Sequence, residues 1–168
     1  MFFARILLIL SLAFGLSACG NKGSLIHIPP YTGPLVTSVI VKKEDRKLYL
    51  MHGNQALKTY DIELGFTPEG HKEFERDGKT PEGAYWIDRR NPQSQYHLSL
   101  GISYPNNADR AHAAANGRSP GGDIFIHGTP RSIEGTEDWT AGCIAVSNRE
   151  VEEIWAMVRD GTPIYIYP

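Results

Sequence analysis

Short apolar runs, rich in β-branched and aromatic residues, recur along the chain and are separated by Gly, Pro and Asn. This pattern is typical of short β-strands joined by tight turns. The predicted strands are 36–41, 47–51, 57–64, 84–87, 96–102, 124–126, 144–146 and 164–166. A turn at Gly53-Asn54 joins the second strand to the third, and the first three strands predict a meander.

One segment has helical rather than alternating periodicity. Ser147 and Glu150 match a capping box, and Gly161 is the expected stop of the helix that follows. The apolar positions between them are Val151, Ile154, Trp155 and Val158, and we expect them to face the core. Residues 107–116 predict a second, shorter helix. The chain therefore predicts a mainly β fold, a closed or sandwich-like sheet with one packed C-terminal helix.

The N-terminal segment has a different character. Residues 1–18 carry one charge, Arg5, and an apolar run that is shorter than the ~20 residues needed to span a bilayer, as in a signal peptide. Small residues then precede Cys19, an order that resembles a bacterial lipoprotein signal cut before a lipidated cysteine. The acyl chains on Cys19 would anchor the protein on the periplasmic side of the cell envelope. By the same resemblance, Gly20 after the cysteine suggests the outer membrane if the cell has two membranes. An ordinary cleavable signal with an incidental cysteine is the alternative.

Residues 19–36 predict a flexible tether, because small polar residues are followed by Pro29, Pro30 and Pro34. Residues 37–168 then form one domain of ordinary size. Loss of the signal peptide would remove one basic residue and no acidic one, changing the net charge from −2 to −3. This weak acidity, without a long basic run, argues against a nucleic-acid partner.

Cys143 is the only free thiol of the chain once Cys19 is lipidated, and His127 lies 16 positions before it. A thiol attacks as the thiolate, so a site must lower its pKa or supply a base, and imidazole is a base near neutral pH. His127 ends one predicted strand and Cys143 begins another, so both side chains can meet at neighbouring strand ends. The spacing leaves open that Cys143 is a small buried hydrophobe and His127 a core residue.

The residues around this pair suggest a substrate site. Gly142 would let its own N–H and that of Cys143 face an oxyanion. The loop 129–140 has room to border a cleft, and Trp139 either walls a groove or pins that loop. The segment 69–79 either is solvated or borders the cleft, and its polar composition favours solvent. Trp86 is expected to be in the core. The remaining histidines show no paired metal-ligand spacing, so neither a metal nor a cofactor is expected.

Several ordered motifs resemble the catalytic domain of the L,D-transpeptidases, also called the YkuD domain. They are GDIFIHGT at 122–129, TAGC at 140–143, GTPIYI at 161–166, KLYL at 47–50 and TPEGAYWI at 80–87. The resemblance spans about residues 37–167 and implies a β-rich cysteine enzyme. It implies that Cys143 is the nucleophile, that His127 is the general base and that the Gly128 carbonyl orients the imidazole.

The resemblance also implies a reaction on peptidoglycan stem peptides, with no cofactor. The thiol would attack at the third stem residue and release the terminal D-alanine, and an amine would resolve the acyl-enzyme. Residues expected to hold the oxyanion or the substrate are Gly142, Thr140, Trp139 and Arg131.

The chain departs from the family pattern at two positions. Ala141 replaces a histidine, and Ala145 replaces an arginine or asparagine that would supply a carboxylate contact. Arg131 or Arg149 is a candidate substitute, although either is also typical of a solvated surface charge. This variant resembles a subgroup that includes amidases that release lipoprotein from murein.

Three functions therefore remain open. The first is an L,D-transpeptidase of cell-wall biogenesis and cell shape. The second is a hydrolase that trims stems or releases murein-attached lipoprotein. The third is a lipid-anchored peptidoglycan-binding protein without turnover.

Overall fold

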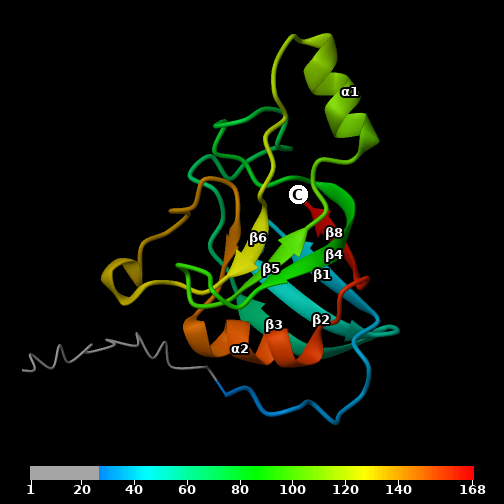
Figure 1. The fold of residues 1–168 in the computed structure, drawn as a ribbon, viewed down its shortest axis with the longest axis vertical. Coiled ribbons are helices and arrows are strands. Elements are labelled where there is room, and N and C mark those ends of the chain that lie inside the picture. Colours follow the sequence, from blue (N-terminus) through cyan, green and yellow to red (C-terminus); the bar gives the residue numbers. More distant parts are fainter. Residues whose placement is uncertain (1–26) are drawn as a thin grey trace, which may run out of the picture.

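The computed structural model describes residues 27–168, so the predicted signal peptide and Cys19 lie outside the described residues (Figure 1). The strands are β1 (Ser38–Lys42), β2 (Lys47–His52), β3 (Gln55–Asp61), β4 (Gly83–Asn91), β5 (Ser99–Ile102), β6 (Phe125–His127), β7 (Ile144–Ala145) and β8 (Pro163–Tyr167). The helices are α1 (Asn107–Ala115), α2 (Asn148–Met157) and the short 3-10 turn η1 (Arg131–Ile133). Across residues 27–168, none of the helices is long and apolar enough to cross a membrane.

The strands form one curled sheet in the order β3-β2-β1-β8-β4-β5-β6-β7. The predicted antiparallel meander of β1, β2 and β3 is confirmed. The last strand, β8, returns between β1 and β4, and β6 and β7 run parallel. Glu63, just after β3, and Ala145 of β7 exchange backbone hydrogen bonds of 2.9 and 2.8 Å. These bonds join the two outer edges of the sheet, as expected for the predicted closed, mainly β fold.

Alternation along the strands produces the core. Val39, Val41, Ile164 and Ile166 are buried, whereas the residues between them face outward. Each fully buried aliphatic side chain of this kind stabilises the fold by about 1.5–3 kcal/mol. The outward alternation also explains why the prediction for Trp86 is wrong: its neighbours Tyr85 and Ile87 point inward, and Trp86 is 56% exposed.

Both predicted helices are present and lie at opposite ends of the molecule (Figure 1). The predicted capping box of α2 is confirmed, because Ser147 accepts from the Glu150 N–H while the Glu150 carboxylate accepts from the Ser147 N–H. The predicted stop at Gly161 is wrong, since α2 ends at Met157 and Val158 is extended. Helix α2 packs against β5 and β6, the strands that lead to His127.

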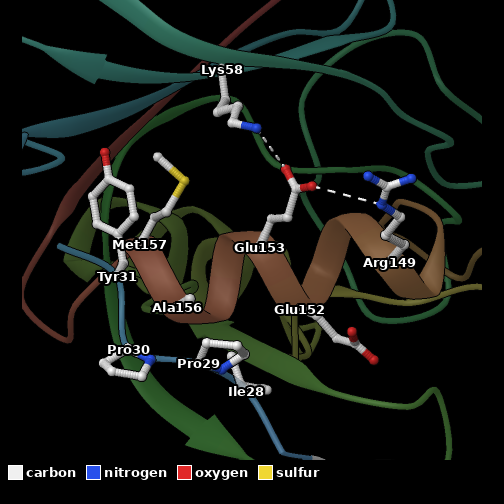
Figure 2. A pocket seen from close by; sticks show the side chains of 10 residues that line it. All are labelled: Ile28, Pro29, Pro30, Tyr31, Lys58, Arg149, Glu152, Glu153, Ala156 and Met157. Atoms are coloured by element: carbon white, nitrogen blue, oxygen red, sulfur yellow. Dashed lines mark hydrogen bonds and ion pairs between the residues drawn. The ribbon is translucent and has the colours of Figure 1, made fainter. Parts of the chain in front are cut away.

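The end of the predicted tether packs against the domain. Val36 is buried, and Ile28 contacts the core. Residues 28–31 run along α2 and enclose a pocket of about 420 Å³ with it, in which Glu153 extends between Lys58 and Arg149 (Figure 2). Neither Cys143 nor His127 lines this pocket. The packed domain thus extends further toward the N-terminus than the predicted boundary at residue 37.

Candidate active site

The sheet brings His127 and Cys143 to one face. His127 is the last residue of β6, and Cys143 directly precedes the parallel strand β7. Because Ile126 pairs with Ile144, continuing the register by one residue places Cys143 beside Phe125. Residues two positions apart on a strand share a face, so the side chains of Cys143 and His127 project from the same side of neighbouring strands. The strand ends that carry the two residues are thus adjacent in the sheet, as predicted, and the direct contact between the two side chains stays a prediction.

Backbone bonds on both sides hold the segment of Cys143 in place. Ala145 pairs with Glu63, and the Val146 N–H donates to the His127 carbonyl at 3.0 Å. Before the cysteine, the Thr140 N–H donates to the Leu64 carbonyl at 3.1 Å. Cys143 thus lies directly before a short strand, in a segment that is bonded to two separate parts of the sheet.

His127 is 2% exposed, and its Nδ1 lies 2.7 Å from the carbonyl oxygen of Gly128. A carbonyl only accepts, so Nδ1 carries the hydrogen and Nε2 keeps its lone pair in the neutral ring. The ring stacks on Tyr96 with centroids 4.6 Å apart. Burial lowers the pKa of His127, and the Gly128 bond offsets this only in part. The imidazole is therefore neutral at neutral pH and has a free acceptor nitrogen.

Gly128 also has a packing role. A Cβ at this position would lie 2.3 Å from Oδ1 of Asn148, at the start of α2. The Gly128 N–H donates to the Tyr96 carbonyl at 3.0 Å. A residue without a side chain is therefore needed to bring His127, α2 and the turn at Tyr96 together.

The Cys143 thiol is partly buried, and its Sγ lies 3.5 Å from the Asp123 carbonyl oxygen, to which the S–H can donate. Burial raises the pKa of Cys143 above its usual value. A hydrogen bond from the Phe125 backbone and the charges of Lys72 and Arg89 favour the thiolate, but they do not overcome the burial. With its pKa raised, the thiol of Cys143 would need a base to react as the thiolate near neutral pH.

The expected role of Gly142 as an oxyanion donor is wrong, because its N–H donates to Thr140 Oγ1 at 3.1 Å. The Thr140 hydroxyl in turn donates to the Cys143 carbonyl at 2.7 Å. Thr140 is 3% exposed, so it braces the turn and does not face a substrate as predicted. Within residues 27–168, the Cys143 N–H has no hydrogen-bond acceptor, and it remains the backbone donor available to an oxyanion.

The backbone at position 142 requires a glycine because of its conformation and its close packing. Its φ is +131°, a value that side chains rarely tolerate, and a Cβ would lie 2.5 Å from the Lys79 carbonyl oxygen.

Trp139 packs on His127 and Tyr96, with its ring centroid 5.5 Å from that of His127 and 5.7 Å from that of Tyr96. Its loop is fastened elsewhere by Asp138, which binds Arg46 at 2.6 Å. Arg131 is exposed in η1 and does not line the pocket at Cys143, so the structure does not support its predicted place in the site. Arg149 lies on α2 and pairs with Glu153 at 3.9 Å, so it is not at this site either (Figure 2).

A pocket of about 190 Å³ opens at Cys143. It is lined by Lys72, Glu75, Arg76, Gly121, Gly122, Asp123, Ile124, Ala141 and Cys143. Three of these residues belong to the segment 69–79. The preferred prediction that this segment is solvated is wrong for Lys72, which is buried, whereas Glu75 and Arg76 are exposed and also line the pocket. Lys72 donates to the Phe74 carbonyl and to the Asp77 carboxylate, both a few residues further along the chain. These local contacts do not reveal from the sequence that Lys72 lies at the pocket of Cys143.

The two departures from the family pattern have different surroundings. Ala141 is exposed and lines the pocket, whereas Ala145 is fully buried opposite His127. A long cation at position 145 would therefore need space that this packing does not leave. In the part of the chain that the structure describes, no cluster of His, Cys, Asp and Glu is arranged to hold a metal ion.

Fold and sequence together define the class of protein. Residues 36–166 match the family profile of the L,D-transpeptidase catalytic domain, YkuD, and the chain belongs to this family. Among its relatives, the Escherichia coli K12 protein named "Putative L,D-transpeptidase YafK" is 31% identical over 146 residues, which are 80% of this chain and 54% of YafK.

Two solved structures are also similar. Pgp2 of Campylobacter jejuni, described as a helical cell shape determining protein, superposes with a TM-score of 0.62 at 26% identity, covering 81% of this chain and 49% of Pgp2. Bd1075 of Bdellovibrio bacteriovorus has a TM-score of 0.58 at 28% identity, with coverages of 85% and 51%. The chain thus spans about half the length of these relatives.

Proposed function

We propose that this protein is a cysteine acyl-transfer enzyme that acts on peptidoglycan stem peptides. Cys143 is the nucleophile and His127 the general base. The observation that carries the proposal is the bond between His127 Nδ1 and the Gly128 carbonyl, 2.7 Å long. It leaves Nε2 of a buried, neutral imidazole free on the sheet face that also carries the thiol.

The first half-reaction follows from these positions. His127 Nε2 takes the thiol proton as Sγ attacks the carbonyl carbon of the third stem residue. The carbon–nitrogen bond to the terminal residue then breaks, and the proton on Nε2 passes to the leaving amine. A thioester to Cys143 remains. The Cys143 N–H, which has no acceptor among the described residues, is the donor for the oxyanion that forms on the way.

The second half-reaction reverses these roles. His127 accepts a proton from the incoming nucleophile, which attacks the thioester and releases the thiol of Cys143. An amine as acceptor gives a new cross-link, and water gives a shortened stem. The methyl group of Ala141 offers no polar contact to an incoming stem, whereas water needs none. This favours hydrolysis, or release of murein-linked lipoprotein, as an activity at least as prominent as cross-linking.

The raised pKa of Cys143 also suits a protein that binds peptidoglycan without turnover. The two possibilities differ in how the thiol reacts. With an enzyme, alkylation of Cys143 near neutral pH depends on His127 and slows in His127→Ala. With a passive binding protein, the His127→Ala substitution leaves the alkylation rate unchanged.

We further propose that lipidated Cys19 anchors the protein on the periplasmic side of the cell envelope. The support is the order of apolar run, small residues and cysteine in the sequence. Wild-type protein would fractionate with membranes and begin with an acylated Cys19, and Cys19→Ser would not. A wild-type protein without acyl mass, starting at another residue, would refute the anchor.

The activity is tested on purified murein that carries tetrapeptide stems and covalently linked lipoprotein. The wild-type protein is expected to yield tripeptide stems or free lipoprotein, and Cys143→Ala to yield neither. New cross-links between third residues, without either hydrolysis product, would show that an amine is the acceptor. Equal products from wild type and Cys143→Ala would exclude the proposed nucleophile.

A further inference from the structure

Arg76 lies at the pocket of Cys143 in an unusual backbone conformation. Its φ is +65°, in the left-handed region that residues other than Gly seldom occupy. The Arg76 side chain is 91% exposed, and its one ion pair within the described residues is a long contact of 3.8 Å to Glu75. Strained backbone that presents a free charge to a pocket is a feature of binding sites more than of passive loops.

The loop that carries Arg76 is held firmly from within. The Asp77 carboxylate accepts from the Lys72 ammonium at 2.8 Å and from the backbone N–H groups of Glu73, Phe74 and Lys79. Burial raises the pKa of Asp77, but these four bonds outweigh it and hold the pKa below its usual range. The carboxylate is therefore charged at neutral pH and fixes the turn on which Arg76 lies.

Outside contacts fix the same loop against the opposite wall of the pocket. The Glu75 N–H donates to the Ser119 carbonyl at 2.8 Å, and a Cβ on Gly121 would lie 3.2 Å from the Glu75 Cα. Phe74 lies under the guanidinium of Arg118, 3.8 Å from its ring centroid. These contacts fix the position of the Arg76 backbone relative to the pocket.

Arg76 is also the cation of the pocket whose donors are least occupied. Lys72 is 2% exposed and donates to Asp77 and to the Phe74 carbonyl. Arg89, which is outside the lining set, pairs with Asp88 and with Asp123. Ala145, where the family pattern has Arg or Asn, is fully buried and uncharged, whereas Arg76 is an exposed cation that lines the pocket at Cys143.

We propose that Arg76 binds a carboxylate of the stem peptide and thereby determines which stems are accepted. This inference rests on the proposed function for the identity of the substrate. The carboxylate comes from one of two sources: the C-terminus of the leaving residue, or the side chain of the third residue where that side chain carries one. Guanidinium suits either, because its planar donors match both carboxylate oxygens.

The experiment measures binding of three synthetic stem tetrapeptides to Cys143→Ala, which removes turnover. One peptide has both carboxylates free, one is amidated at the C-terminus, and one is amidated on the side chain of its third residue. Adding Arg76→Gln is expected to weaken binding of the free peptide about tenfold, as for loss of one charged hydrogen-bonded contact at an exposed site. One of the two amidated peptides should bind equally with and without Arg76, and that peptide identifies the source of the carboxylate.

Two variants separate binding from folding. Arg76→Gly keeps a backbone that tolerates φ +65° and removes the guanidinium, so it should bind as weakly as Arg76→Gln while remaining as stable as the parent. Arg131→Gln, an exposed arginine outside the pocket, is the matched control and should bind all three peptides like the parent. An equal effect of Arg76→Gln on all three peptides, or none on any, would overturn the proposal.

Turnover distinguishes this proposal from the proposed function. In the protein with Cys143 intact, Arg76→Gln should raise KM about tenfold for the free peptide and leave kcat nearly unchanged. If no peptide is turned over but the pattern of binding losses holds, the proposed function fails and the assignment of Arg76 stands. If turnover proceeds but Arg76→Gln changes neither KM nor binding, the assignment fails alone.

Discussion

The Nδ1 atom of His127 lies 2.7 Å from the carbonyl oxygen of the next residue, Gly128. This bond selects the tautomer in which Nε2 is the acceptor. A backbone carbonyl carries no net charge, so it orients the ring without the strong rise in imidazole pKa that a carboxylate partner would cause. Burial therefore sets the direction of the shift and keeps the base neutral.

The pH dependence of kcat/KM follows from this arrangement. His127 must be neutral to take the thiol proton, and its pKa is lowered from an ordinary value of about 6.5. Activity should therefore fall only as the pH drops below about 6.5 and should be level above it. In His127→Ala, the slower rate should rise roughly tenfold per pH unit through alkaline pH, because the thiolate must form without a base. A wild-type acid limb centred above pH 7 would contradict the neutral imidazole.

Gly142→Ala should destabilise the fold and disturb the nucleophile. The new Cβ would meet the Lys79 carbonyl at 2.5 Å on a backbone with φ +131°. We expect a loss of about 3 kcal/mol in the free energy of unfolding. Gly53→Ala is the control, since its φ is +55° with nothing within 4 Å, and it should lose only about 1 kcal/mol. Chemical denaturation of both variants measures the difference, and equal losses would refute the steric explanation.

Thr140→Val tests the brace beneath the cysteine. The substitution keeps the shape but leaves the Gly142 N–H and the Cys143 carbonyl without the bonds of 3.1 and 2.7 Å. A loss of about 2 kcal/mol in stability is expected. Activity should fall at least tenfold. Thr140→Ser retains the hydroxyl and should remain close to wild type in activity. Equal activity of the Val and Ser variants would show that the brace does not position the thiol.

Asp77→Asn should loosen the loop that carries Arg76. It leaves the buried Lys72 ammonium without its charged partner, which should lower stability by about 3 kcal/mol. The pKa of Asp77 is lowered in the folded state, so its contribution is complete above the unfolded pKa of about 3.9 and is lost as the pH falls through the lower, folded value. Wild type should therefore lose this contribution in acid, and Asp77→Asn should lack that part of the pH dependence.

The surface pair of Lys42 and Asp45, half exposed and 3.6 Å apart, supplies the control for that measurement. Asp45→Asn should change stability by less than about 0.5 kcal/mol. A similarly small change in Asp77→Asn would mean that the loop does not depend on the Asp77 carboxylate.

Local pattern predicts much of this molecule. Alternation and capping locate the meander and both helices, because hydrophobic periodicity and the Ser147 cap act over a few residues. Ordered motifs also single out Cys143, His127 and the Gly128 carbonyl; the His127–Gly128 bond is present, and Cys143 lies on the neighbouring segment of the sheet.

The misassigned residues depend on contacts between distant segments. The place of Arg76 beside Cys143 requires the loop 72–79 to pack on 118–122, and no local pattern records that approach. The N–H of Gly142 is satisfied by Thr140 two residues earlier, and a glycine in a motif does not reveal whether its donor is free. Trp86 lies on a strand with neighbouring strands on both sides, but no other part of the described chain covers the face of the sheet from which its side chain projects, so the side chain is exposed.

Intact-mass measurement after mixing with a stem tetrapeptide tests the nucleophile most directly. Rapid acid quench should trap a thioester that adds the mass of the tripeptide acyl group, and peptide mapping should locate it on Cys143. His127→Ala should accumulate the adduct more slowly, and Cys143→Ala should show none. Turnover by Cys143→Ala, or an adduct on any other residue of the wild-type protein, would contradict the assignment of Cys143 as the attacking group.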